Sequence, residues 1–178
     1  ASPISTENLH LDFIYDDADG DSLTTTEIEW SVDGVHAPEH DGSMTINASH
    51  TSKGDIWTVR VRASDGIDMS PWTASSPRNI MNSPPELLNF SLGPEDATTI
   101  SQLEVEYTWL DPDEDPLSIV HVHWFLDGER IIDHEDLPTI ASAHTLRGQN
   151  WQAEIVLEDS DGATSTNHAN PAPNHRSN

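Results

Sequence analysis

Cysteine is absent from this 178-residue sequence, and basic residues and long apolar runs are scarce. Without cysteine the chain can form no disulfide, no thiolate metal site and no thiol nucleophile. Seven Lys and Arg stand against 32 Asp and Glu, which gives a formal net charge of −25. Such a charge repels nucleic acid and anionic lipid, so neither is an expected partner. No apolar run approaches the length of a membrane-spanning helix, so direct membrane insertion is not expected.

What the sequence does contain is an internal repeat with a shift of 94 residues. Asp17–Leu23 falls on Asp111–Leu117, Trp30–Gly34 on Trp124–Gly128, and Gly54–Trp57 on Gly148–Trp151. These anchors align without a gap, so the chain is read as two copies of one structural unit. Each copy is large enough to bury a core of its own, with six Trp supplying much of the apolar surface.

The apolar residues of each copy alternate with polar ones, which is typical of half-buried strands. In the second copy the predicted strands lie at 87–92, 103–109, 122–126, 131–132, near Ile140, and at 151–157 before a last strand after Gly162. In the first copy they are marked by Leu9 to Phe13, Ile28 to Val32 and Trp57 to Val61. We therefore predict an all-β chain of two tandem seven-stranded immunoglobulin-like antiparallel β-sandwiches. Trp30 with Trp57, and Trp124 with Trp151, are the expected core anchors between the sheets.

The predicted boundaries are residues 1–80 for repeat 1, 81–85 for the linker, 86–170 for repeat 2 and 171–178 for a C-terminal tail. Ala1 aligns with Glu95, so repeat 1 lacks a counterpart of the strand at 87–92. The sequence begins without Met, and we expect a segment of a longer tandem array. The alternative is that another chain supplies the missing strand, although the tail, with no apolar residue in 174–178, is a poor donor.

Acidic residues recur at alternate positions in the loop between the second and third strands of both copies. These are Asp17, Asp19 and Asp21 in the first copy and Asp111, Asp113 and Asp115 in the second. Closely spaced carboxylates supply the hard oxygen ligands that calcium requires. An EF-hand is excluded, because its glycine and glutamate positions are not filled by those residue types. The loops are predicted calcium sites, and the alternative is a pair of hydrated turns.

In an immunoglobulin topology the loop between the second and third strands lies beside the loop between the last two strands. Asp159, Asp161 and Glu86 are therefore expected to join the acids of the second copy, and Asp65 those of the first.

Other candidate sites carry weaker signals. His121 and His123 share one strand face, which is read as solvated rather than as a zinc site because no third ligand is visible. Trp72 lies outside the repeat pattern and is either packed at the joint between the copies or exposed as a sugar platform. Asn47 and Asn89 begin glycosylation sequons. No nucleophile–base arrangement or phosphate-binding loop is present, so an enzyme is not expected.

The runs Asp-x-Asp-Gly-Asp-Ser-Leu, Trp-Ser-Val-Asp-Gly and Gly-Asp-Ile-Trp-Thr-Val-Arg-Val-Arg-Ala-Ser-Asp-Gly resemble the PKD and cadherin-like tandem repeats of bacterial and archaeal surface proteins. The resemblance implies an extracellular or cell-surface stalk, adhesion or assembly module, often stiffened by calcium. Its partners would be neighbouring immunoglobulin-like domains or copies of itself. Two alternatives stay open: a subunit of a filament built by strand complementation, and a carbohydrate-binding accessory module that contacts cell-surface glycans.

Overall fold

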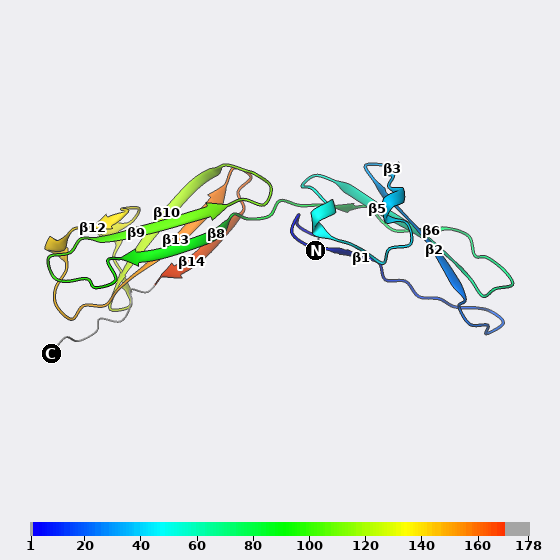
Figure 1. The fold of residues 1–178 in the computed structure, drawn as a ribbon, viewed down its shortest axis with the longest axis horizontal. Helices are drawn as coiled ribbons and strands as arrows, with labels where there is room; N and C mark the ends of the chain where they lie inside the picture. The colour runs from blue at the N-terminus through cyan, green and yellow to red at the C-terminus, as the bar shows by residue number, and fades with distance from the viewer. Residues whose placement is uncertain (1, 170–178) are drawn as a thin grey trace. The chain divides into compact units, whose positions relative to one another are not determined.

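The computed structural model describes residues 2–169 and divides the chain into two compact units. Unit 1 is Ala1–Ser83 and unit 2 is Pro84–Asn178, so the division falls inside the predicted linker at 81–85 (Figure 1). Residues 81 and 83 nevertheless bond within unit 1, because Ser5 N–H donates to Met81 O at 3.0 Å and the Ser5 and Ser83 hydroxyls lie 2.7 Å apart. The tail predicted at 171–178 lies outside the described residues.

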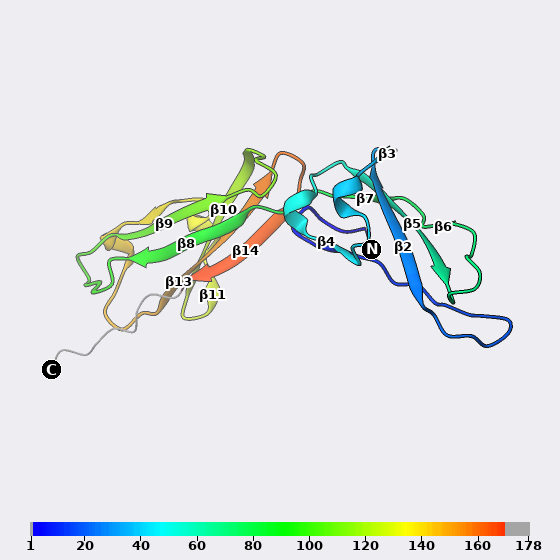
Figure 2. The same cartoon turned by 45° about the vertical axis from the view of Figure 1, so that its right-hand side comes forward.

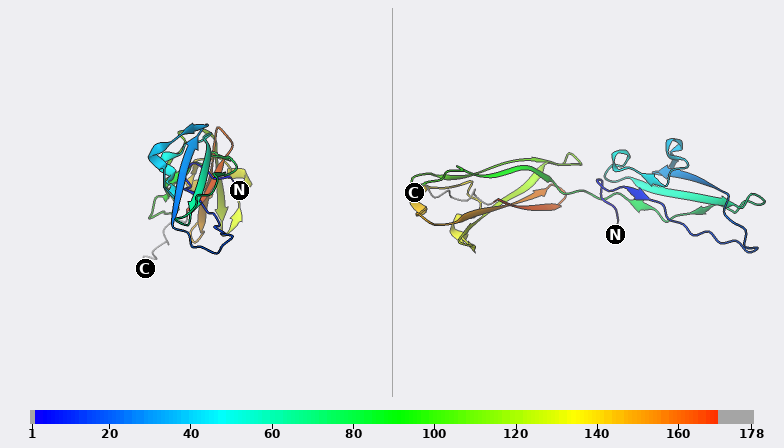
Figure 3. Two further views of the ribbon diagram at one scale, coloured as in Figure 1. Left: turned by 90° about the vertical axis from the view of Figure 1, so that its right-hand side faces the viewer. Right: turned by 60° about the horizontal axis from the view of Figure 1, so that its bottom comes forward.

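Unit 2 is a seven-stranded antiparallel β-sandwich, as the sequence predicts. Its strands are β8 (Glu86–Gly93), β9 (Leu103–Leu110), β10 (Leu117–Leu126), β11 (Glu129–Arg130), β12 (Thr139–Ile140), β13 (Trp151–Asp159) and β14 (Thr164–Ala169). One sheet has the order β12-β9-β8 and the other β11-β10-β13-β14. Figure 3 shows the two sheets of this unit as separate layers.

Unit 1 repeats this arrangement without a counterpart of β8. Its strands are β1 (Leu9–His10), β2 (Thr25–Val32), β3 (Val35–His36), β4 (Thr45–Ile46), β5 (Ile56–Ser64), β6 (Thr73–Ala74) and β7 (Arg78–Asn79). β1 pairs with β4, and β3, β2, β5 and β6 form the second sheet, with β7 also on β5. The absence of the first strand from unit 1 is therefore confirmed for the described residues.

The core of each unit is built around two tryptophans in edge-to-face contact. The ring centroids of Trp30 and Trp57 lie 6.2 Å apart, and those of Trp124 and Trp151 lie 6.3 Å apart. Both members of each pair come from neighbouring strands of one sheet, β2 with β5 or β10 with β13, and face the other sheet. The predicted anchors are confirmed, although neither pair takes one residue from each sheet.

Hydrophobic alternation positions the acidic loop after β13 as well as the core. Every second residue of β13 is buried, from Trp151 to Leu157, and the same alternation turns Asp159 inward with no exposed surface. Strands β2 and β10 each end at a two-residue hairpin turn, Asp33-Gly34 and Asp127-Gly128, in which both residues have positive φ. Such a turn matches the twist of the flanking strands and favours the Asp-Gly pair.

Two predicted strands differ from the structure. The prediction of a strand at Ile131-Ile132 is wrong. The hairpin turn pairs Leu126 with Glu129, so β11 begins directly after the turn, at Glu129. A 3₁₀ helix, η3 (Ile132–His134), follows instead. The first strand of unit 1, expected from Leu9 to Phe13, stops at His10; Leu11 N–H still donates to Met44 O at 2.9 Å, but within residues 2–169 residues 12–16 make no backbone–backbone hydrogen bond.

Within the described residues, no helix has the length and apolar content to cross a membrane. The helices there are 3₁₀ turns of three residues: η3, η1 (Pro38–His40), η2 (Ala48–His50) and η4 (Ser142–His144).

Candidate metal centre

Two loops of unit 2 meet at one end of its sandwich. Residues 111–116 join β9 to β10, and residues 160–163 join β13 to β14 (Figure 1). Strand pairing brings the loops together, since Leu117 is the partner of Asp159 and Leu110 is the partner of Glu86. The topology predicted from the sequence therefore does place these acidic positions at one end of the unit.

Asp111 organises the first of these loops. Its Oδ1 accepts the backbone N–H of Asp113 at 2.8 Å and that of Asp115 at 3.0 Å. These bonds fold residues 111–115 back over the carboxylate, and the side chain of Asp111 is drawn out of solvent, with 4% of the residue exposed. A short acidic side chain followed by Pro is well suited to such a turn.

The second oxygen of Asp111 is the unusual feature of this loop. Asp111 Oδ2 is buried and has no hydrogen-bond partner. One carboxylate oxygen from each of Asp111, Asp113 and Asp115 lies within 4.8 Å of the others, and residues 2–169 contain no other group of three or more metal-ligating side chains at that spacing. Burying an unpaired carboxylate oxygen beside two further carboxylates is unfavourable unless a cation compensates it. The donor set is all oxygen, so the residues present fit a hard divalent cation such as calcium.

Asp159 orders the second loop in the same way. Its Oδ1 accepts the N–H of Asp161 at 2.8 Å and that of Ala163 at 2.9 Å, while Ser118 Oγ donates to Asp159 O at 2.6 Å. Asp159, Asp161 and Glu86 lie outside the group whose carboxylates meet within 4.8 Å. Their role as calcium ligands stays a prediction.

The corresponding loop of unit 1 has the same backbone turn but a more open arrangement. Asp17 Oδ1 accepts the N–H of Asp19 at 2.9 Å and that of Asp21 at 3.1 Å. Asp17 is half-buried and the other two are exposed, and their carboxylates do not meet the spacing seen in unit 2. A calcium site in unit 1 also stays a prediction.

Asp65 belongs to the same end of unit 1. Backbone N–H donors at Asp68 and Ile67 lower the pKa of its carboxyl. Partial desolvation raises the pKa of Tyr15, and the charges of Asp17, Asp65 and Asp21 add to that shift. Tyr15 Oη donates to Asp21 O at 3.3 Å and Thr24 Oγ1 donates to Asp65 O at 2.6 Å, so both acidic loops of unit 1 lie at this end of it, as the predicted topology requires.

The histidines of β10 are bonded to carboxylates on the outer face of their sheet. His121 Nδ1 lies 3.0 Å from Asp136 Oδ1, and His123 Nδ1 lies 2.7 Å from Glu154 Oε1. Glu154 Oε2 is also 3.1 Å from His168 Nε2. Only 14% of the His123 side chain is exposed, so the expected solvated face holds for His121 but not for His123. The cross-strand partner Glu154 could not be found without the register.

A histidine pair that sequence reasoning missed recurs in both units. His40 and His50 contact edge to face at 4.9 Å, as do His134 and His144. In each unit the first of these rings also contacts the second tryptophan of the core pair, Trp57 or Trp151. The 94-residue shift aligns both histidines, which is the signal that could have identified the pair.

Trp72 lies over the outer face of unit 1's own sheet. The guanidinium carbons of Arg60 and Arg62 are 4.5 and 4.6 Å from its ring centroid. Arg62 also bonds Glu27, with 2.6 Å between Nη2 and Oε2, and Arg60 bonds Glu29. Cation–π contacts of this kind occupy ring face that a sugar would need.

The two sequons differ in their surroundings. Asn47 is exposed and immediately precedes η2. Asn89 is exposed on β8, but its Nδ2 donates to Thr108 Oγ1 at 2.8 Å. Glycosylation at either residue stays a prediction.

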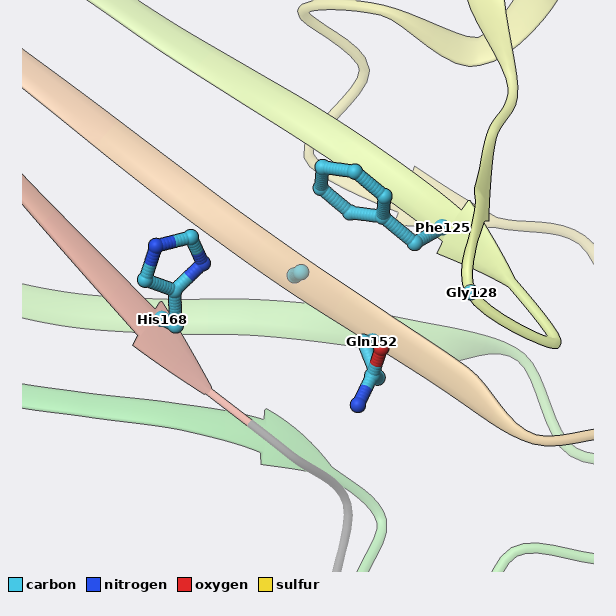
Figure 4. A pocket seen from close by; sticks show the side chains of 5 residues that line it. Phe125, Gly128, Gln152 and His168 are labelled. Atoms are coloured by element: carbon cyan, nitrogen blue, oxygen red, sulfur yellow. The ribbon is translucent and has the colours of Figure 1, made fainter.

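A shallow depression of about 320 Å³ lies on the outer face of the β10–β13–β14 sheet (Figure 4). Phe125, Gly128, Gln152, Ala153 and His168 line it. It lies toward the Leu126–Trp151 end of the β10–β13 pair, whereas Leu117 and Asp159, beside the acidic loops, form the other end.

Comparison with known proteins assigns no family. No family model matches the sequence, and no curated protein matches it. Solved structures with similarity include the fibronectin(III)-like modules of CbhA from Clostridium thermocellum, at 15% identity and a TM-score of 0.32, covering 99% of this chain and 92% of that one. The chicken interferon gamma receptor alpha chain has 11% identity and a TM-score of 0.43, with coverages of 94% and 93%. The amphioxus IgVJ-C2 molecule has 9% identity and a TM-score of 0.31, with coverages of 93% and 94%.

Proposed function

We propose that this chain is an extracellular structural or adhesive module of a surface protein, and that calcium bound in the Asp111–Asp115 loop stiffens its second unit. The observation that carries the proposal is the buried, unpartnered Oδ2 of Asp111 within a group of three carboxylates. The 94-residue repeat supports a tandem module, since repeated units of this kind build stalks and arrays.

Calcium is the cation that suits this loop best. Calcium accepts six to eight oxygen ligands in irregular geometry and takes both carboxylates and waters, whereas magnesium demands a nearly ideal octahedron. Asp111, Asp113 and Asp115 would hold the ion, with water completing the shell. The ion would offset the repulsion among the three carboxylates and fix the connection between β9 and β10. A braced loop of this kind resists local opening, which suits a module that bears load.

Isothermal titration of the full chain with calcium tests the proposal. We expect saturable binding by the wild type and a loss of at least about tenfold in affinity for Asp111→Asn, which keeps an Oδ1 acceptor for the loop but removes the charge. Asp17→Asn is the matched control, because it makes the same change in the equivalent loop of unit 1 and should leave the affinity of the Asp111–Asp115 loop unchanged. Equal affinities for the wild type and Asp111→Asn would rule out this site.

A filament subunit joined by strand complementation is the second candidate. The observation that favours it is the segment at residues 12–16 of unit 1, which makes no backbone–backbone hydrogen bond within residues 2–169. A carbohydrate-binding module is less well supported, because guanidinium groups lie over the Trp72 ring.

A further inference from the structure

A row of three metal-ligating side chains crosses the outer face of one sheet of unit 2. His123 on β10 is the cross-strand partner of Glu154 on β13, and Glu154 is the partner of His168 on β14. The three strands are neighbours in that sheet (Figure 2). Directly opposed residues of adjacent antiparallel strands share one face of the sheet, with Cβ atoms about 5 Å apart. The strand register therefore gathers two imidazoles around one carboxylate.

Both imidazole rings already contact that carboxylate. Glu154 Oε1 lies 2.7 Å from His123 Nδ1, and Glu154 Oε2 lies 3.1 Å from His168 Nε2. In a tetrahedral zinc site, neighbouring donor atoms lie about 3.3 Å apart, so each of these N···O separations would widen only slightly. The three donors do not all lie within 4.8 Å of one another. The His168 side chain is 66% exposed and so has room to turn toward His123 and complete the group.

The equivalent row in unit 1 has a different chemistry at the same positions. The 94-residue shift carries His123, Glu154 and His168 onto Glu29, Arg60 and Ala74. Arg60 forms an ion pair with Glu29, and Ala74 lies opposite Arg60 on β6. A guanidinium keeps its positive charge and alanine offers no donor atom, so this row cannot bind a cation. Unit 1 thus provides an internal control for the row in unit 2.

We propose that His123, Glu154 and His168 bind a zinc ion, with water in the fourth position. Two imidazoles and one carboxylate suit zinc, whereas calcium takes oxygen ligands. The ring of His123 is held in place, since its side chain is 14% exposed and it stacks on His121 with 5.9 Å between the ring centroids. The depression lined by His168 leaves space for water beside the row (Figure 4). The ion would fasten β14, at the edge of its sheet, to β10 across β13.

Isothermal titration of the full chain with zinc chloride, in a buffer with excess calcium, tests the proposal. We expect one saturable site and a loss of at least about tenfold in affinity for both His168→Ala and Glu154→Gln. His168 is exposed, so its replacement should leave the fold intact. His144→Ala is the matched control, because it removes another exposed imidazole of unit 2 that lies outside the row, and it should bind zinc like the wild type.

The zinc site and the calcium site of the proposed function share no residue, so each can fail alone. Asp111→Asn should therefore bind zinc with wild-type affinity. A loss of zinc affinity in Asp111→Asn would assign the ion to the acidic loop and overturn the proposal. A loss in His144→Ala would assign it to the pair of His134 and His144, with the same consequence.

Amide hydrogen exchange provides a second readout. Zinc should slow exchange within β14 (Thr164–Ala169) of the wild type but not of His168→Ala, and it should leave β6 of unit 1 unchanged. Absence of saturable zinc binding, equal affinities for the wild type and His168→Ala, or zinc binding without protection of β14 would overturn the proposal.

Discussion

Asp111 and Asp159 fold two neighbouring loops of unit 2 with the same hydrogen-bond pattern. Each Oδ1 accepts the backbone N–H groups two and four residues further along the chain, and each residue is buried. Asp159 is the last of the inward-facing residues of β13, and the hydroxyl of Ser118 on the adjacent strand β10 donates to its backbone carbonyl oxygen. Asp111 differs because its Oδ2 has no hydrogen-bond partner and because one oxygen of its carboxylate lies within 4.8 Å of an oxygen from each of Asp113 and Asp115. The same turn therefore recurs at two buried acids, of which Asp111 belongs to the group of three carboxylates and Asp159 does not.

Removing one charge from the acid group should change the stability of the chain in opposite directions with and without calcium. In EGTA, Asp113→Asn should stabilise unit 2 by up to about 1 kcal/mol, since it relieves repulsion between carboxylates. In excess calcium the same substitution should destabilise it, because a ligand is lost. Thermal unfolding followed by circular dichroism in the two buffers measures both signs. A hydrated turn without a cation would give the same sign in both buffers.

The bond between Asp136 and His121 should contribute a pH-dependent stability. The His121 hydrogen bond, assisted by the Val122 N–H, lowers the pKa of the Asp136 carboxyl. Its contribution is therefore fully present above the unfolded pKa of about 3.9 and is lost as the pH falls through the lower folded value. Asp136→Asn should lower the thermal midpoint above about pH 4, and the difference from wild type should shrink under more acidic conditions.

The control for that experiment is His121→Asn, in which the principal partner of Asp136 is gone. In this background Asp136→Asn should cost less than it does in the wild type, since the two residues share one bond. An Asp136→Asn effect that is independent of pH, or independent of His121, would contradict the assignment.

The core tryptophans should matter far more for stability than Trp72. Trp124 has no exposed surface, so Trp124→Ala should destabilise unit 2 by about 3–5 kcal/mol. Trp72 lies over two guanidinium groups on the outer face, and Trp72→Ala should cost unit 1 about 1–2 kcal/mol. Chemical denaturation of both variants gives the comparison. Equal losses would mean that the outer-face cluster is as important as the core.

Trp72 also decides the carbohydrate alternative. Because arginine side chains occupy its ring face, a glycan array should show no signal that depends on Trp72. Wild type and Trp72→Ala, tested side by side, provide the measurement. A glycan bound by the wild type and lost in Trp72→Ala would favour the carbohydrate-binding role over the structural one.

Much of the fold could be predicted because one residue type or one turn decides each element. Alternation predicted the inward faces of β10 and β13, but in β9 only Leu103 and Val105 are buried, whereas Tyr107 and Trp109 are exposed. Asp127-Gly128 predicted the hairpin that follows β10. A strand was expected at Ile131-Ile132 because branched apolar residues favour strands. The tight hairpin instead places β11 at Glu129–Arg130. At that point the geometry of the turn, rather than the strand preference of the individual residues, determines the structure.

The candidate site was predictable only in part. The spacing of Asp111, Asp113 and Asp115 predicted a shared loop, but the burial of Asp111 depends on the backbone N–H groups that fold over it. The pairing of His123 with Glu154 depends on strand register, which connects residues 31 positions apart. No local pattern in the sequence carries that information.

Thermal unfolding with calcium or with EGTA tests most directly whether the Asp111–Asp115 loop holds calcium. Wild type and Asp17→Asn should both melt several degrees higher in excess calcium, because a ligand that binds only the folded state adds to its stability. In Asp111→Asn, unit 2 should melt at the same temperature in both buffers. An unchanged wild-type midpoint, or an undiminished calcium shift in Asp111→Asn, would contradict the account.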